Sequence, residues 1–194
     1  MILVRSLVTA VAGLLLAGGA PSSAQAPLPS HGGGAQASAP ATGAATAGGV
    51  TWTVPDPWAP GPGSAMRVAT YDVPGAKNAE AGQCAVFYFG RGQGGAVEAN
   101  VQRWAGQFKE KPTPKDERRT VAGVPVTVVA IEGTYMNPGG GMMQSQGEKP
   151  GYRLLGAIVE APEGNVFFKL TGPAATVGAA EAAFEGLVGS IARK

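Results

Sequence analysis

The most informative stretch for the fold is Gln83-Cys84-Ala85-Val86-Phe87-Tyr88-Phe89. Its side chains are apolar on both alternating sets of positions, which is typical of a β-strand that is covered on both faces. We therefore expect this strand to lie near the middle of a sheet, with other elements packed above and below it.

The segments that follow supply these elements. Apolar residues first recur at the spacing of one helix face. They are Val97, Val101, Trp104, Ala105 and Phe108. Residues 109–119 are charged and contain two prolines, so we expect them to end that helix and form an exposed connection. Two β-hairpins are then predicted, one from strands 118–122 and 125–135 and the other from strands 152–160 and 166–171.

Two earlier strands, 51–54 and 66–73, and one terminal helix complete the predicted domain. Pro173 suits the first position of that helix, and an apolar stripe runs from Val177 to Ile191. Arg193 and Lys194 would complement its C-terminal dipole. The order predicts an α+β fold, in which a mostly antiparallel sheet packs with two main helices as an α/β/α sandwich.

The first 26 residues have the tripartite pattern of an export signal. Arg5 supplies the positive charge, residues 7–17 the apolar segment, and Ala24-Gln25-Ala26 the cleavage site. The apolar segment is shorter than the roughly 20 residues of a membrane-spanning helix. We expect residues 1–26 to be removed and the mature protein to be secreted or periplasmic, with no membrane span. An uncleaved N-terminal anchor is the alternative.

Residues 27–49 are almost entirely Ala, Gly, Ser, Pro and Thr, a composition that predicts a disordered linker. Residues 50–194 are then a single domain. The chain's one histidine, His31, lies in the linker, so this domain contains none. Removal of Arg5 leaves 14 basic and 13 acidic groups. This nearly neutral charge offers no electrostatic attraction to nucleic acid. We also expect the protein to be a monomer.

The first strand runs into Val54-Pro55-Asp56-Pro57-Trp58, and Phe167-Phe168-Lys169-Leu170-Thr171-Gly172-Pro173 leads to a helix that closes with Ser190-Ile191. With the paired late strands, these segments resemble the Mog1/PsbP-like superfamily. That group includes photosystem extrinsic subunits, a nuclear GTPase-binding factor and exported bacterial proteins of unknown role. The resemblance implies an α/β/α sandwich and a binding or assembly role. It brings no shared catalytic motif and so assigns no site residue.

Residues 90–95, Gly-Arg-Gly-Gln-Gly-Gly, match the pattern GxGxxG between a predicted strand and a predicted helix. Backbone amides at such a helix start can hold a phosphate. The candidate anion site therefore comprises Gly94, Gly95 and Ala96, with Arg91 as the cation. A dinucleotide-binding fold needs parallel βαβ units on both sides, whereas a hairpin follows here. The alternative is a glycine-rich turn.

Three methionines, Met136, Met142 and Met143, lie in or beside a glycine-rich loop, and thioethers suit Cu(I). No histidine or cysteine reinforces this candidate metal site, so a loop with adaptable apolar side chains is the alternative. Met142 and Met143 could also form a lid over an apolar pocket or a partner surface. Trp58 is a candidate recognition aromatic, the alternative being packing onto the sheet edge.

Catalytic arrangements that use histidine are excluded from the domain, because Ser-His-Asp and Cys-His sites need an imidazole as proton carrier. The lone thiol of Cys84 is expected to be a small buried hydrophobe, with a reactive thiol as the alternative. Carboxylates could still pair in space, and solvated strand ends are the alternative. The candidates for such a pair are Asp56, Asp72, Glu132 and Glu160.

The leading hypothesis is an exported, non-catalytic binding or assembly module with no cofactor. Its partner would be a protein or a small molecule in the cell envelope. The alternatives are an envelope protein that binds Cu(I) through the Met136, Met142 and Met143 loop, and an envelope hydrolase that uses paired carboxylates.

Overall fold

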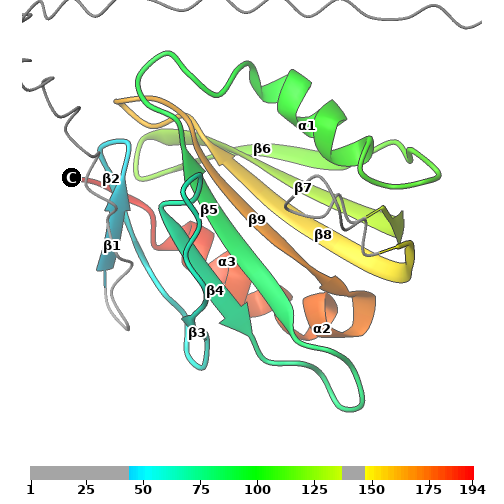
Figure 1. Cartoon of the computed structure of the whole chain (residues 1–194). Coiled ribbons are helices and arrows are strands. Elements are labelled where there is room, and N and C mark those ends of the chain that lie inside the picture. The colour runs from blue at the N-terminus through cyan, green and yellow to red at the C-terminus, as the bar shows by residue number, and fades with distance from the viewer. Residues whose placement is uncertain (1–43, 137–146) are drawn as a thin grey trace, which may run out of the picture. The chain divides into compact units, whose positions relative to one another are not determined.

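The computed structural model describes residues 44–136 and 147–194. Seven of the strands in these residues form one antiparallel sheet in the order β3-β4-β5-β9-β8-β7-β6 (Figure 1). The strands are β3 (Ala59–Pro60), β4 (Ala69–Val73), β5 (Gly82–Tyr88), β6 (Lys115–Val121), β7 (Val124–Tyr135), β8 (Lys149–Val159) and β9 (Val166–Pro173). The predicted strand at 83–89 is β5, an interior strand between β4 and β9.

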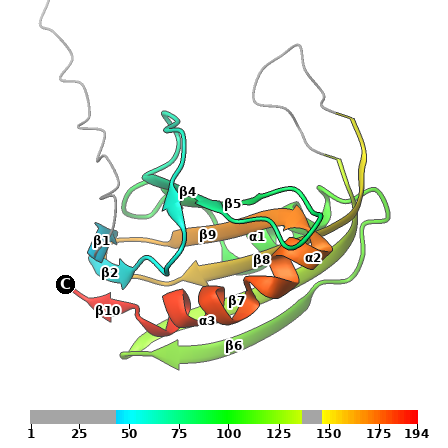
Figure 2. The same cartoon turned by 90° about the horizontal axis from the view of Figure 1, so that it is seen from below.

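Helices cover both faces of this sheet, which confirms the α+β fold class (Figure 2). The helix predicted from residues 97–108 is α1 (Val97–Ala105), and it packs on one face. The opposite face carries α2 (Ala174–Ala179) and α3 (Glu181–Gly189). Among residues 44–136 and 147–194, no helix is long and apolar enough to cross a membrane.

The expectation of one continuous terminal helix is wrong. The chain breaks at Ala180, between α2 and α3. Gly178 lies just before the break, and glycine has one of the lowest helix propensities. The predicted apolar stripe is nevertheless buried in both pieces, with Val177 in α2 and Phe184 in α3 fully enclosed.

A second, smaller sheet contains β1 (Ala44–Ala47), β2 (Val50–Thr53) and β10 (Ala192–Arg193), with β2 in the middle. β10 replaces the predicted helical C-terminus. The guanidinium of Arg193 therefore donates to the carbonyl of Gly123 at 2.7 Å and does not cap a helix.

β1 also corrects the boundary of the predicted linker. Residues 44–47 fall inside the segment 27–49, yet they pair with β2 over four positions. The side chain of Ala45 is buried in the core, because alanine is small enough to pack where β1 meets the domain. The predicted signal and the linker residues 27–43 lie outside the described residues.

The predicted exposed connection at 109–119 is also partly wrong. Its second half belongs to β6, which pairs with β7 from Lys115 to Val121. The side chains of residues 115–118 remain exposed, as the charges predict. A charged strand at a sheet edge is common, because the charges oppose further strand pairing.

The larger core lies between the sheet and the layer formed by α2, α3 and β2. The indole N–H of Trp52 donates to the hydroxyl of Tyr71 at 3.2 Å, and its ring meets Phe168 edge-on at 5.0 Å between centroids. Trp58 belongs to this core and is only 3% exposed. It is therefore not the exposed recognition residue considered above.

The smaller core lies under α1, and its packing depends on a glycine in the sheet. Trp104 of α1 lies against Gly156 of β8, where an added Cβ atom would overlap the indole ring. The absence of a side chain at Gly156 therefore lets α1 approach the sheet. Val101, Phe108 and Ile158 belong to the same core as Trp104.

Candidate functional site

Aromatic side chains gather on the face of the sheet that carries α1. Phe87 of β5 lies directly opposite Phe167 of β9, and Phe89 follows β5. The ring of Phe89 stacks on Phe87 at 6.2 Å and approaches Phe167 at 5.9 Å between centroids. Phe89 remains 38% exposed, so this aromatic group faces solvent in part.

α1 covers this face incompletely and leaves a cavity of about 230 Å³ beside its inner face. We call it the aromatic cavity. It is lined by Met66, Phe87, Phe89, Asn100, Arg103, Trp104, Gln107, Phe167 and Lys169. Small, mostly apolar cavities with a few polar groups are the usual form of ligand sites.

The exposed large hydrophobic residues of the described chain also fall on this side. Met66 is 65% exposed and, like Phe89, lines the cavity. Met136 is 43% exposed, and its backbone N–H donates to the carbonyl of Gln107, a lining residue, at 2.8 Å. Exposed apolar side chains that line a cavity mark interaction sites more often than scattered single residues do.

Lys169 places a cationic group among these rings. Its Nζ donates to Oε1 of Gln107 at 2.6 Å and to the hydroxyl of Tyr135 at 3.0 Å. The same nitrogen lies 5.3 Å from the centroid of the Tyr135 ring. Burial, together with the smaller effect of the nearby charge of Arg67, lowers the pKa of Lys169 to about 8.

No carboxylate of the chain neutralises Lys169. All 13 Asp and Glu residues lie in the described segments, and none forms an ion pair with it there. None of them lines the aromatic cavity either. The lysine is thus held by neutral partners only, although buried charges in proteins are normally paired.

Two arginines add positive charge around the same cavity. Arg67 donates to Oε1 of Gln83 at 2.7 Å and lies 5.8 Å from the centroid of the Phe87 ring. Arg103 of α1 is a lining residue that donates to Oδ1 of Asn100. The aromatic cavity therefore has mostly apolar walls, and the charged groups around it are positive.

The predicted anion site does not line this cavity, but its residues contact Asn100 and Phe167, which do. Asn100 donates to the carbonyls of Gly94 and Ala96, both at 2.8 Å, and Asn165 donates to the carbonyl of Gly95. Gly94 packs so closely on Phe167 that an added Cβ atom would clash with the ring. These contacts give residues 94–96 a defined structural role. Anion binding at their backbone amides, with the exposed Arg91 as the cation, stays a prediction.

Of the predicted copper ligands, Met136 lies exposed just after β7. Met142 and Met143 fall outside the described residues. Within segments 44–136 and 147–194, no three His, Cys, Asp or Glu side chains gather as a metal site.

The structure separates the carboxylates considered for catalysis. Glu132 lies opposite Arg153 in the β7 and β8 pairing and forms an ion pair with it at 3.2 Å. Glu160 follows the other end of β8 and pairs with Arg118 at 2.5 Å. β7 and β8 are paired strands, and their antiparallel register places these two glutamates at opposite ends of the pairing, so they do not form a carboxylate pair.

Cys84 is buried in the larger core, as the sequence predicts. Burial raises the pKa of its thiol to about 12. Since the thiolate is the reactive form, the folded protein holds this residue in an unreactive state.

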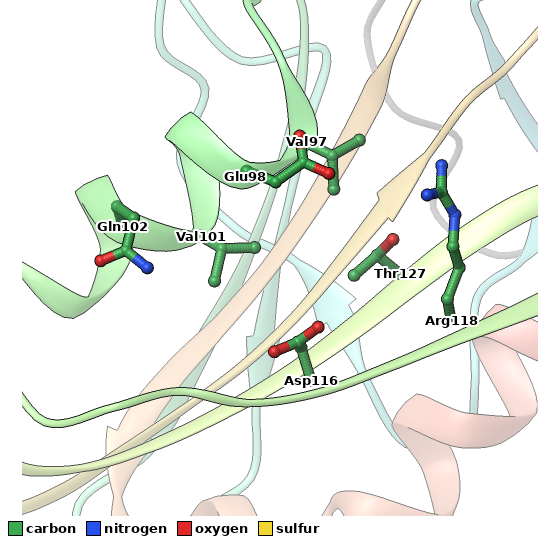
Figure 3. A pocket seen from close by; sticks show the side chains of 7 residues that line it. All are labelled: Val97, Glu98, Val101, Gln102, Asp116, Arg118 and Thr127. Carbon is green, nitrogen blue, oxygen red and sulfur yellow. The ribbon is translucent and has the colours of Figure 1, made fainter.

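A second, more polar cavity of about 150 Å³ lies between the start of α1 and β6 (Figure 3). Glu98 of α1 and Asp116 of β6 lie on opposite sides of it. The Thr127 hydroxyl lines it and is buried without a hydrogen-bond partner among the described residues. Arg118 also lines this cavity, but its charge is engaged by Glu160. This site has less apolar surface than the aromatic cavity, and its two carboxylates, Glu98 and Asp116, are on exposed residues.

Comparison with known proteins assigns no family. No protein-family model and no curated protein matches the sequence. Among solved structures, the chain is similar to the crystal structure of PA94 from Pseudomonas aeruginosa, a protein of unknown function, with 13% sequence identity and a TM-score of 0.41. The match covers 79% of this chain and 97% of PA94. At this level of similarity, a function can be proposed only from this chain's own side chains.

Proposed function

We propose that this protein is an exported, non-catalytic binding module whose ligand is a small molecule with an apolar body, bound in the aromatic cavity. One observation carries the proposal: Phe87, Phe89 and Met66 form an apolar wall of the cavity beside α1, and Phe89 and Met66 are exposed to solvent. A ligand there would remove this wall from water, which is the main source of affinity in such sites.

The size of the cavity sets the scale of the interaction. About 230 Å³ suits a ligand of roughly ten non-hydrogen atoms, and small ligands gain on the order of 0.3 to 0.5 kcal/mol per atom. A binding free energy of about 3 to 5 kcal/mol corresponds to a Kd of roughly 0.2 to 6 mM. A natural ligand that fills the cavity and also pairs with its polar groups would bind more tightly.

Location and family belong to the same proposal. Residues 1–26 would direct export and be removed, and the domain would act as a monomer in the periplasm or outside the cell. The resemblance to the Mog1/PsbP-like superfamily, whose members generally bind or assemble, supports a binding role. The α+β architecture is compatible with this resemblance.

The proposal can be tested with a neutral aromatic probe. Titration of the mature protein with 3-phenylpropan-1-ol should perturb the backbone NMR signals of residues that line the aromatic cavity. Phe89→Ala should weaken this binding several-fold, because it removes one wall. Met136→Ala changes an equally exposed apolar residue that does not line the cavity, so it should leave binding unchanged. Perturbations elsewhere, or equal effects of both variants, would contradict the proposal.

A further inference from the structure

We infer that the aromatic cavity selects an anion, and that its ligand is a small monocarboxylate with an aromatic or branched apolar body whose carboxylate pairs with Lys169. This inference rests on the proposed function, since it names the chemical class of ligand for the same cavity. It adds a role for the cation that the apolar walls alone do not explain.

The first argument is the hydrogen bonding of Lys169. An ammonium group carries three N–H donors. Two of them are used by Oε1 of Gln107 and the hydroxyl of Tyr135, at 2.6 and 3.0 Å. No described residue accepts the third. Because Lys169 lines the cavity, a bound acceptor can complete its hydrogen bonding.

The second argument is charge. Lys169 is largely withdrawn from water without a carboxylate partner, and such a charge is destabilised unless an anion accompanies it. The charged or titratable groups around it are Arg67 before β4, Arg103 on α1 and Tyr135 on β7. Its directly opposite neighbours in the sheet, Ala85 on β5 and Gly156 on β8, are neutral. Every fixed charge at the cavity is therefore positive.

The third argument is shape. Ala85 and Gly156 are small, so the aliphatic stem of Lys169 lies in the sheet without a large side chain directly opposite it. The rings of Phe87 and Phe167 stand one row further along the strands, and the ring of Phe89 lies beyond them. A ligand that places its carboxylate at Lys169 would lay its apolar body against these rings. Both parts of a short aryl or branched alkyl carboxylate are thus accommodated.

The test compares three probes of nearly equal shape that differ in charge. Isothermal titration calorimetry or NMR titration of the mature protein at pH 7 and low salt would use 3-phenylpropionate, 3-phenylpropionamide and 3-phenylpropylamine. We expect the carboxylate to bind roughly ten- to a hundredfold more tightly than the amide, as hydrogen bonds to charged groups imply, and the amine to bind least.

Variants locate the effect. Lys169→Met should reduce the affinity for the carboxylate to that for the amide, and leave the affinity for the amide within about twofold. Lys169→Gln should act in the same way, which separates loss of charge from a change in packing. Lys115→Met, at an exposed lysine of β6, should change nothing.

The possible results distinguish a failure of the carboxylate inference from a failure of the proposed function. If the carboxylate and the amide bind equally in the aromatic cavity, the inference is overturned while the proposed function stands. If the carboxylate preference persists in both Lys169 variants, Lys169 is not its source and the inference is again overturned. If no probe binds in the cavity, the proposed function fails and the inference fails with it.

Discussion

Gly156 lies directly beneath the indole ring of Trp104, so that the glycine of β8 and the tryptophan of α1 share space that only one side chain can occupy. This relationship fixes how closely α1 approaches the sheet. It therefore also fixes the width of the aromatic cavity, which Trp104 lines.

Gly156→Ala should destabilise the protein. The added methyl group would overlap the Trp104 ring, and overpacking of a core of this kind costs about 1 to 3 kcal/mol. The free energy of unfolding in urea measures this change. Gly186→Ala is the matched control, because an added Cβ atom in α3 meets nothing within 4 Å and should stabilise the helix by about 0.5 to 1 kcal/mol. Equal effects of the two substitutions would contradict the packing of Trp104 on Gly156.

Lys169→Met should make the protein more stable at pH 7, by roughly 1 to 3 kcal/mol, since one pKa unit corresponds to about 1.4 kcal/mol. The folded pKa of about 8 lies below the value of about 10.4 for an unperturbed lysine. Between these pH values the unfolded chain still holds a proton that the folded protein has released, so wild-type stability rises with pH.

The advantage of Lys169→Met should therefore shrink from pH 7 towards pH 10. Urea unfolding at pH 7, 8.5 and 10 would follow it, with Lys115→Met as a control for general charge effects. A constant difference across this range would mean that burial does not disfavour the charged form of Lys169.

Ala45→Asp should destabilise the domain by about 1 to 3 kcal/mol, because it places a carboxylate in the core at a position that the sequence alone assigned to a flexible linker. Thr46→Asp places the same carboxylate on the exposed side of β1, where it removes only the hydrogen bond from the Thr46 hydroxyl to the carbonyl of Val50, and should have a much smaller effect. Thermal unfolding of both variants compares them. If the two lose the same stability, β1 does not pack as described.

Cys84 should resist thiol reagents in the folded protein, since its buried thiol, with a pKa of about 12, holds almost no thiolate at pH 8. Labelling with a chromogenic disulfide reagent should be complete in 6 M guanidinium chloride and extremely slow in its absence. Fast labelling of the folded protein would support the reactive thiol considered from the sequence.

The elements that could be predicted from sequence were those with a strong local pattern. The unbroken apolar run at 83–89 and the helical spacing of Val97, Val101 and Trp104 predicted β5 and α1 nearly at their observed bounds. The order of strands was not predictable in the same way. The pairing of β5 with β9 joins segments about 80 residues apart, and no local pattern records that contact.

The candidate site was missed for a related reason. Lys169 lies in the apolar run Phe167-Phe168-Lys169-Leu170, and alternation places it on the same face as Phe167. That pattern was the available signal for a lysine facing a covered side of the sheet. Whether such a lysine could bind a ligand depends on the position of α1, on the small Gly156 beside it and on how far every carboxylate lies from it. These features arise from contacts between distant segments, so no local pattern predicts them.

The position of β2 between β1 and β10 has a consequence for the order of folding. Synthesis makes β2 about 140 residues before its second partner, so Val50 and Thr51 have no pairing on that side until Ala192 and Arg193 emerge. Contacts of such long sequence separation form late and slow the folding of a chain. Pairing of β2 with residues 192–193 is therefore a late step, and a nascent chain that lacks these residues exposes a strand edge open to association with other chains.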